Sequence, residues 1–227
     1  MAEDESSPDF HSSKLGTQEY WDAAYSQELQ AFQELGDVGE IWFGEEAQER
    51  MVRWLADKSE LPPSSAIVDL GCGNGMLLLA LRERGFSDLI GLDYSEGAIE
   101  LSKKIAEKKQ GETNITFKVC DLLSSKATEN LFCGKRFDVC LDKGTYDAIS
   151  LHNVEKPDDR LAYIHNVSSL LKEAGLLMIT SCNWTREQLE KQFQEDFEFV
   201  HEIPAPKFKF GGKSGQTVTT LVLKRKN

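Results

Sequence analysis

The 227-residue chain lacks the features of several large protein classes. It has no run of about 18 apolar residues, so we predict no membrane-spanning helix. The five cysteines are odd in number and form no CxxC pair, and the four histidines show no metal-ligand spacing with them. The first residues are acidic and polar, unlike a signal or transit peptide. We therefore predict reduced thiols, no metal and a cytoplasmic protein, with the nucleus as a second compartment.

Positive charge is scarce in the first quarter of the chain. Residues 1–60 hold 15 acidic and 4 basic side chains, whereas residues 61–227 hold 23 and 22. Nearly all of the net charge of −12 therefore precedes the first expected core strand. Such a segment repels DNA and RNA, so we expect no nucleic-acid partner. It either attracts a basic protein partner or only keeps the segment soluble. No repeated apolar face suggests assembly, and we expect a monomer.

Glycine is concentrated directly after a short apolar run at 67–70. The run contains Asp69 and leads into Gly71, Cys72, Gly73 and, after one more residue, Gly75. A continuous apolar run predicts a buried parallel strand, and glycines at its carboxyl end let the backbone approach a ligand closely. A dinucleotide loop needs G-x-G-x-x-G, but here the third glycine comes one residue early. The spacing disfavours a dehydrogenase and resembles motif I of the seven-strand S-adenosylmethionine-dependent methyltransferases; an ordinary strand-to-helix turn is the alternative.

Acidic residues also follow the next two expected strands. Asp93 ends the strand at 89–93, about 20 residues past the glycine loop, where a carboxylate can accept hydrogen bonds from ribose hydroxyls. A solvated turn residue is the alternative for Asp93. Asp121 follows the strand at 115–120, and in the methyltransferases that the loop resembles an acidic residue there commonly meets the adenine amino group. We therefore predict S-adenosylmethionine as the cofactor, held by Trp42, Asp69, Gly71, Cys72, Gly73, Gly75, Asp93, Tyr94, Asp121 and Leu122.

The whole pattern predicts an α/β fold with a Rossmann-like, doubly wound sheet of seven strands. The sheet should be mostly parallel, with an antiparallel seventh strand because no helix separates the last two strands. The length and the 40% apolar content fit one main domain. We expect a disordered acidic tail at 1–13, a helical and aromatic segment at 14–63, and a cofactor-binding methyltransferase domain at 64–227. The expected strands are 67–70, 89–93, 115–120, 137–142, 176–181, 197–202 and 217–223; the expected helices are 16–35, 45–56, 76–81, 96–109, 158–172 and 185–193.

Four aromatic residues precede the first core strand: Trp21, Tyr25, Trp42 and Phe43. They could fold over the cofactor as a lid. They could equally form a small hydrophobic cluster that holds the amino-terminal helix to the sheet. The flanking acid and glycine of the second pair favour the lid for Trp42 and Phe43.

A second group of polar residues follows the fourth strand, at 142–147. Open α/β sheets bind ligands beyond the carboxyl ends of their strands, so this loop should lie beside the reacting methyl group. A lysine acceptor, with a pKa of about 10.4, is mostly protonated at pH 7. A carboxylate can attract and orient it, and a desolvated aromatic wall lowers its pKa. We predict these roles for Asp142 and Tyr146, where Tyr146 could instead be a hydrogen-bond partner; a helix cap or a solvated turn acid is the alternative for Asp142.

Six segments of the chain match one family. They are Trp21-Asp22-x-x-Tyr25, Gly39-Glu40-Ile41-Trp42-Phe43-Gly44, the glycine loop with the strand before it, Asp142-Lys143-Gly144-Thr145-Tyr146-Asp147-Ala148-Ile149-Ser150, Thr180-Ser181-Cys182-Asn183-Trp184-Thr185 and Pro206-Lys207-Phe208-Lys209-Phe210-Gly211-Gly212. Together they resemble the elongation factor 1-alpha lysine methyltransferase family. The resemblance implies methyl transfer from S-adenosylmethionine to a lysine of translation elongation factor 1-alpha, a basic protein. Two other functions stay open: a methyltransferase for another protein or a small-molecule amine, and a pseudoenzyme that binds cofactor or partner without turnover.

Overall fold

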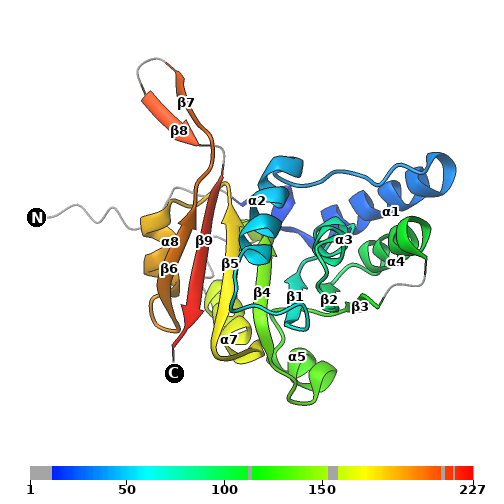
Figure 1. Ribbon diagram of the computed structural model, residues 1–227. Coiled ribbons are helices and arrows are strands. Elements are labelled where there is room, and N and C mark those ends of the chain that lie inside the picture. Colours follow the sequence, from blue (N-terminus) through cyan, green and yellow to red (C-terminus); the bar gives the residue numbers. More distant parts are fainter. Residues whose placement is uncertain (1–11, 112–113, 153–157, 211–212, 217, 227) are drawn as a thin grey trace, which may run out of the picture.

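A seven-stranded sheet lies at the centre of the protein (Figure 1). The computed structural model describes residues 12–111, 114–152, 158–210, 213–216 and 218–226. The strands of this sheet are β1 Ala66–Leu70, β2 Asp88–Asp93, β3 Thr116–Val119, β4 Phe137–Lys143, β5 Leu171–Ser181, β6 Phe197–Ile203 and β9 Thr219–Arg225. Their order across the sheet is β3-β2-β1-β4-β5-β9-β6. The first five strands in sequence pair in parallel.

Helices cover both faces of the sheet and bury a separate apolar cluster on each. The first face carries α1 Gln18–Leu35, α2 Gly44–Ala56, α3 Met76–Glu83 and α4 Glu96–Gln110. The second face carries α5 Ser125–Phe132, α6 Thr145–His152, α7 Asp158–Leu170 and α8 Arg186–Phe193. Along β1 the neighbours Ile67 and Val68 belong to opposite clusters, as the alternating side chains of a strand require. A strand buried on both faces is apolar along its whole length, and this explains the continuous run from which β1 was predicted.

The antiparallel seventh strand is confirmed, and it lies inside the sheet (Figure 1). β9 pairs antiparallel with both β5 and β6, so Thr219 lies opposite Ser181 and Thr220 lies opposite Ile203. A short hairpin of β7 Lys207–Phe210 and β8 Lys213–Gln216 stands between β6 and β9 in sequence and forms a second, two-stranded sheet. No strand was predicted between 202 and 217.

Some predicted boundaries were wrong. The helix predicted at 158–172 ends at Leu170, and β5 begins at Leu171, five residues earlier than predicted. Leu161, an apolar residue of that helix, is 59% exposed instead of buried. Helices α5 and α6 were not predicted. The tail predicted at 1–13 lies almost wholly outside the described residues and stays a prediction.

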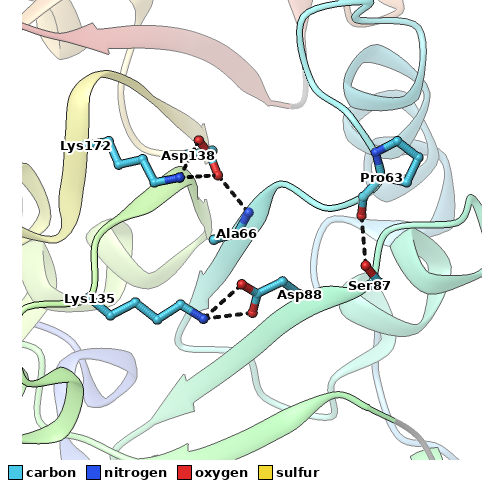
Figure 2. Close-up of polar contacts among 7 residues, drawn as sticks. All are labelled: Pro63, Ala66, Ser87, Asp88, Lys135, Asp138 and Lys172. Carbon is cyan, nitrogen blue, oxygen red and sulfur yellow. Dashed lines mark hydrogen bonds and ion pairs between the residues drawn. The ribbon is translucent and has the colours of Figure 1, made fainter.

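Polar contacts join the strands at the amino-terminal end of the sheet (Figure 2). The Asp138 carboxylate accepts a hydrogen bond from the Ala66 backbone N–H at 2.8 Å and pairs with the Lys172 ammonium at 2.9 Å. The Lys135 ammonium contacts both carboxylate oxygens of Asp88, at 2.8 and 2.9 Å. These partly exposed pairs contribute little stability each, but together they link the starts of β1, β2, β4 and β5. The opposite, carboxyl-terminal end of the sheet is left for a ligand.

In the part of the chain that the structure describes, no helix combines the length and the apolar character that crossing a membrane requires.

Candidate functional site

A pocket opens at the carboxyl ends of β1, β2, β4 and β5, where an open α/β sheet binds its ligands. The loops after these strands line it, together with the segment that precedes β1. Leu122, which follows β3, also lines it, so the structure brings together residues from six parts of the sequence. Of the predicted cofactor-binding residues, the pocket is lined by Trp42, Gly71, Cys72, Gly73, Asp93, Tyr94 and Leu122. Three others, Asp69, Gly75 and Asp121, do not line it.

The glycine loop needs glycine for two separate reasons. Gly71, Gly73 and Gly75 have φ angles of +70°, +51° and +73°, a region that side chains other than glycine's rarely adopt. Neighbouring atoms also fill the space of a side chain. A Cβ atom on Gly71 would overlap the hydroxyl oxygen of Thr145, and one on Gly73 would lie 2.5 Å from the hydroxyl oxygen of Tyr25. Gly75 acts away from the pocket, as the residue that begins α3.

Asp93 has a fixed carboxylate at the end of β2. One of its oxygens accepts the Gly73 backbone N–H and the other accepts the Ser95 backbone N–H, both at 3.0 Å. Burial raises the pKa of Asp93 to about 6. A carboxylate accepts up to four hydrogen bonds, so Asp93, which lines the pocket, can accept more than these two, as predicted for ribose hydroxyls. Asp121, in contrast, is exposed and accepts the Leu123 backbone N–H at 2.9 Å.

Lys143 and Asp69 bring opposite charges to the buried ends of β4 and β1. Asp69 is 2% exposed, and burial raises its pKa to about 7, against the opposing effect of the Lys143 charge. Burial lowers the pKa of Lys143. Its ammonium lines the pocket and donates to the backbone carbonyl of Trp42 at 3.2 Å. The sequence analysis quoted Lys143 within a motif but gave it no role. A lysine at the end of an apolar strand was the feature of the sequence that could have identified it as a site residue.

The segment at 38–43 is tied to the sheet by backbone contacts. Besides the contact of Lys143, the side-chain amide of Asn74 donates to the carbonyls of Val38 and Glu40, at 3.0 and 3.1 Å. Asn74 lies between the glycines of the loop, so the loop and the segment share one rigid contact. The sequence analysis did not single out Asn74.

Aromatic side chains from the amino-terminal region line the pocket on its outer side. Trp21, Tyr25 and Trp42 all line it, and the Trp21 ring contacts the other two, with ring centroids 5.0 Å from Trp42 and 5.9 Å from Tyr25. The Trp21 indole N–H donates to the carbonyl of Leu15 at 2.7 Å. Leu15 belongs to η1 Lys14–Gly16, which lies against α6 through a hydrogen bond from the Ser13 N–H to the Leu151 carbonyl. Trp21 therefore lines the pocket and also packs against the first apolar cluster, while its role as a lid stays a prediction.

The structure corrects the predicted direct role of Asp142 and Tyr146. Neither lines the pocket, and both are 0% exposed. The Asp142 carboxylate accepts the backbone N–H groups of Thr145 and Tyr146 at 2.8 and 3.0 Å, and the Tyr163 hydroxyl at 2.6 Å. It therefore caps the start of α6, which is the alternative considered for it. The Tyr146 ring packs inside the second apolar cluster, 5.0 Å from the ring of Phe193.

Asp147, one turn into the same helix, does line the pocket. It is 5% exposed, and burial raises its pKa. The Ser181 hydroxyl donates to one carboxylate oxygen at 2.5 Å, and the Cys182 backbone N–H donates to the other at 2.8 Å. Cys182 and Asn183 line the pocket beside it. The predicted site thus gains a carboxylate from α6 that the sequence analysis quoted without assigning a function.

Comparisons with known proteins agree with this architecture. Residues 62–224 match the family model for a methyltransferase domain. The EEF1A lysine methyltransferase 2 of Danio rerio is 48% identical over 96% of this chain and 91% of its own length, and that of Homo sapiens is 47% identical over 95% and 89%. The protein-lysine N-methyltransferase EFM4 of Saccharomyces cerevisiae is 35% identical over 96% and 98%.

Solved structures are similar in fold at low sequence identity. A methyltransferase from Anabaena variabilis superposes with a TM-score of 0.64 and 17% identity, over 96% of this chain and 97% of its own. The N-methyltransferase NodS from Bradyrhizobium japonicum gives a TM-score of 0.64 and 14% identity, over 91% and 99%. The fold prediction is confirmed, and so is the family resemblance, because the curated relatives match nearly the whole chain. The chain belongs to the methyltransferase family that includes EEF1A lysine methyltransferase 2 and the yeast protein-lysine N-methyltransferase EFM4.

Proposed function

We propose that this protein transfers methyl groups from S-adenosylmethionine to a lysine of translation elongation factor 1-alpha. The observation that carries this function is the pocket itself. It joins a glycine cradle and the Asp93 carboxylate, which suit a nucleoside cofactor, to the buried carboxylate of Asp147, which suits a cationic acceptor. The names of the curated relatives supply the identity of the acceptor protein.

The described residues fit the cofactor by shape and by chemistry. Thr145 and Tyr25 pack directly on Gly71 and Gly73 because neither glycine has a Cβ atom, and the bare backbone of the loop can approach a ligand closely. Asp93 would accept hydrogen bonds from the ribose hydroxyls, and Tyr94 and Leu122 would flank the base. When bound, S-adenosylmethionine supplies a methyl group on a positively charged sulfur. The aromatic cover of Trp21, Tyr25 and Trp42 keeps water away from this side of the pocket.

The acidic front of the chain suits a basic protein substrate. Residues 1–60 carry nearly all of the net negative charge, and Glu40 from this region lines the pocket. Opposite charge accelerates the encounter of two proteins and repels wrong partners, nucleic acids among them. We propose that the protein works as a monomer in the cytoplasm, with the nucleus as a second compartment.

The test is a methyl-transfer assay with labelled S-adenosylmethionine. Purified elongation factor 1-alpha and whole-cell extract serve as acceptors, and mass spectrometry maps the labelled residue. Gly73→Arg, which fills the cradle, is the variant expected to be inactive. Its control is Gly134→Arg, which puts the same side chain on an exposed loop where a Cβ meets nothing within 4 Å. We expect label on a lysine of the factor with the wild type and Gly134→Arg, and none with Gly73→Arg. Label only on another protein or on small molecules, or no label at all, would refute the function.

A further inference from the structure

The Asp147 carboxylate is buried, opens into the pocket and has no cation beside it. It is 5% exposed, yet among the described residues no lysine, arginine or histidine forms an ion pair with it. Removing a carboxylate from water is costly unless hydrogen bonds and a counter-charge compensate for the lost solvation. Asp147 has the hydrogen bonds but lacks the counter-charge.

The three other buried carboxylates near the site have different partners and positions. Asp142 accepts three hydrogen bonds within the fold and faces away from the pocket. Asp69 lies near the charge of Lys143 and does not line the pocket. Asp93 lines the pocket beside the glycine loop, where it accepts two backbone N–H groups. Of these four, only Asp147 both lines the pocket and stands beside the ends of β4 and β5, on the far side of the glycine loop from β2.

Donors from the end of β5 and the residues after it hold the Asp147 carboxylate in position. The Ser181 hydroxyl binds one oxygen and the Cys182 N–H binds the other. The Cys182 thiol and the Asn183 N–H also interact with this carboxylate. These donors fix the carboxylate beside the pocket and stabilise its negative charge, but they supply no positive charge.

Phe43 forms an aromatic wall of the same pocket. Its ring lies 3.1 Å from the position that a Cβ atom would take on Gly144, three residues before Asp147. The backbone of Phe43 has a φ of +64°, which is strained for a bulky residue and is found mostly where the surrounding structure needs it. An aromatic face packs well on the methylene chain of a lysine and attracts its charged end.

We propose that Asp147 binds and orients the amino group of the acceptor lysine, and that Phe43 forms the wall along which its side chain enters. The assignment rests on the proposed function. It transfers to Asp147 and Phe43 the chemistry that the sequence analysis gave to Asp142 and Tyr146. The ammonium that the lysine brings supplies the missing counter-charge, and the fixed carboxylate sets the direction of its N–H bonds.

The test compares Asp147→Asn with Asp57→Asn, the same change at an exposed position far from the pocket. With saturating cofactor, we expect Asp147→Asn to lower kcat/KM for the protein substrate about 30-fold or more, because a buried ion pair loses one partner. The Kd for S-adenosylmethionine, measured by calorimetry, should change less than about threefold. Asp57→Asn should match the wild type in both measurements.

Two results would overturn the assignment. One is an Asp147→Asn enzyme with wild-type kcat/KM. The other is a loss of cofactor affinity as large as the loss of activity, which would assign the carboxylate to the ammonium of the cofactor. A wild type that leaves the elongation factor unmethylated would instead refute the proposed function. Phe43→Leu tests the same site without touching the buried carboxylate: we expect a raised KM for the protein substrate, and an unchanged KM would remove Phe43 from the wall.

Discussion

Replacing Gly71 with alanine should destabilise the protein through one identifiable contact. The new Cβ would overlap the hydroxyl oxygen of Thr145 and would lie 3.1 Å from its Cβ and Cγ2 atoms. Thr145 cannot simply move away. Its hydroxyl donates to the carbonyl of Leu70 at 2.6 Å, and its backbone N–H donates to Asp142 at 2.8 Å. Gly71 also has a φ of +70°.

The magnitude follows from three costs. The left-handed backbone costs an alanine about 1 kcal/mol. Displacing the Thr145 hydroxyl loses a hydrogen bond of about 1 kcal/mol. The remaining overlap in a packed region costs about 1–3 kcal/mol. We therefore expect Gly71→Ala to lower the free energy of unfolding by about 3–5 kcal/mol.

A double-mutant cycle separates the contact from the backbone effect. Thr145→Ala removes the overlapping atoms and should cost about 1 kcal/mol alone. In the double variant the overlap is gone and the Thr145 hydrogen bond is lost only once, so its loss should be about 2–4 kcal/mol smaller than the sum of the single losses. Gly85→Ala is the control for the backbone, because Gly85 has a φ of +96° and a Cβ there meets nothing within 4 Å. Urea unfolding of all variants measures the effects. Losses that add within about 0.5 kcal/mol would refute the contact.

Three further outcomes are expected. Because the pKa of Asp93 is about 6, cofactor binding should be strongest above that pH and weaken as the carboxylate is protonated below it. In Asp93→Asn, calorimetry should show a cofactor affinity about 10-fold lower at pH 8 and a smaller loss of affinity between pH 7 and 5. A loss of affinity identical to that of the wild type would argue against Asp93. Tyr163→Phe should lower the free energy of unfolding, measured in urea, by about 2 kcal/mol, because the hydroxyl stabilises the ionised form of Asp142. The pKa of Asp142 is about 7, so this loss should be largest at high pH and should shrink as the pH falls through 7. A loss below about 0.5 kcal/mol at high pH would contradict the contact. In Gly16→Ala the new Cβ would overlap the backbone of His152, so we expect faster hydrogen exchange over 13–25 and a several-fold higher Kd for the cofactor; unchanged exchange would show that η1 is not held there.

Most of the sheet could be predicted because its signals are local. Buried parallel strands read as unbroken apolar runs, and the run before Gly71 identified β1 and its loop. The short helices α5 and α6 were missed because each has only eight residues, which is too short a window for apolar periodicity to identify a helix. α6 depends on Asp142, which caps it from the end of a strand and looked like a loop residue in the sequence. The hairpin of β7 and β8 leaves the main sheet, so the pattern of the sheet does not predict it.

The acidic residue that faces the pocket could not be chosen from sequence. Asp142 and Asp147 stand in one motif and have the same chemistry. What separates them is their position relative to α6. Asp142 lies before the helix and accepts its first backbone N–H groups, whereas Asp147 lies in its first turn and lines the pocket. The contacts that fix Asp147 come from Ser181 and Cys182, 34 and 35 residues away along the chain. No pattern within the motif carries that information.

The position of β9 has a consequence for how the protein is made. β9 is the last strand of the sheet in sequence, yet it fills the gap between β5 and β6. During synthesis, the first five strands can pair as they emerge, but β5 keeps an open edge until the ribosome has delivered β9. β6 has no neighbour in the main sheet until then. Such an unpaired edge is a site for misassociation between nascent chains, so completion of this sheet depends on rapid insertion of its final strand.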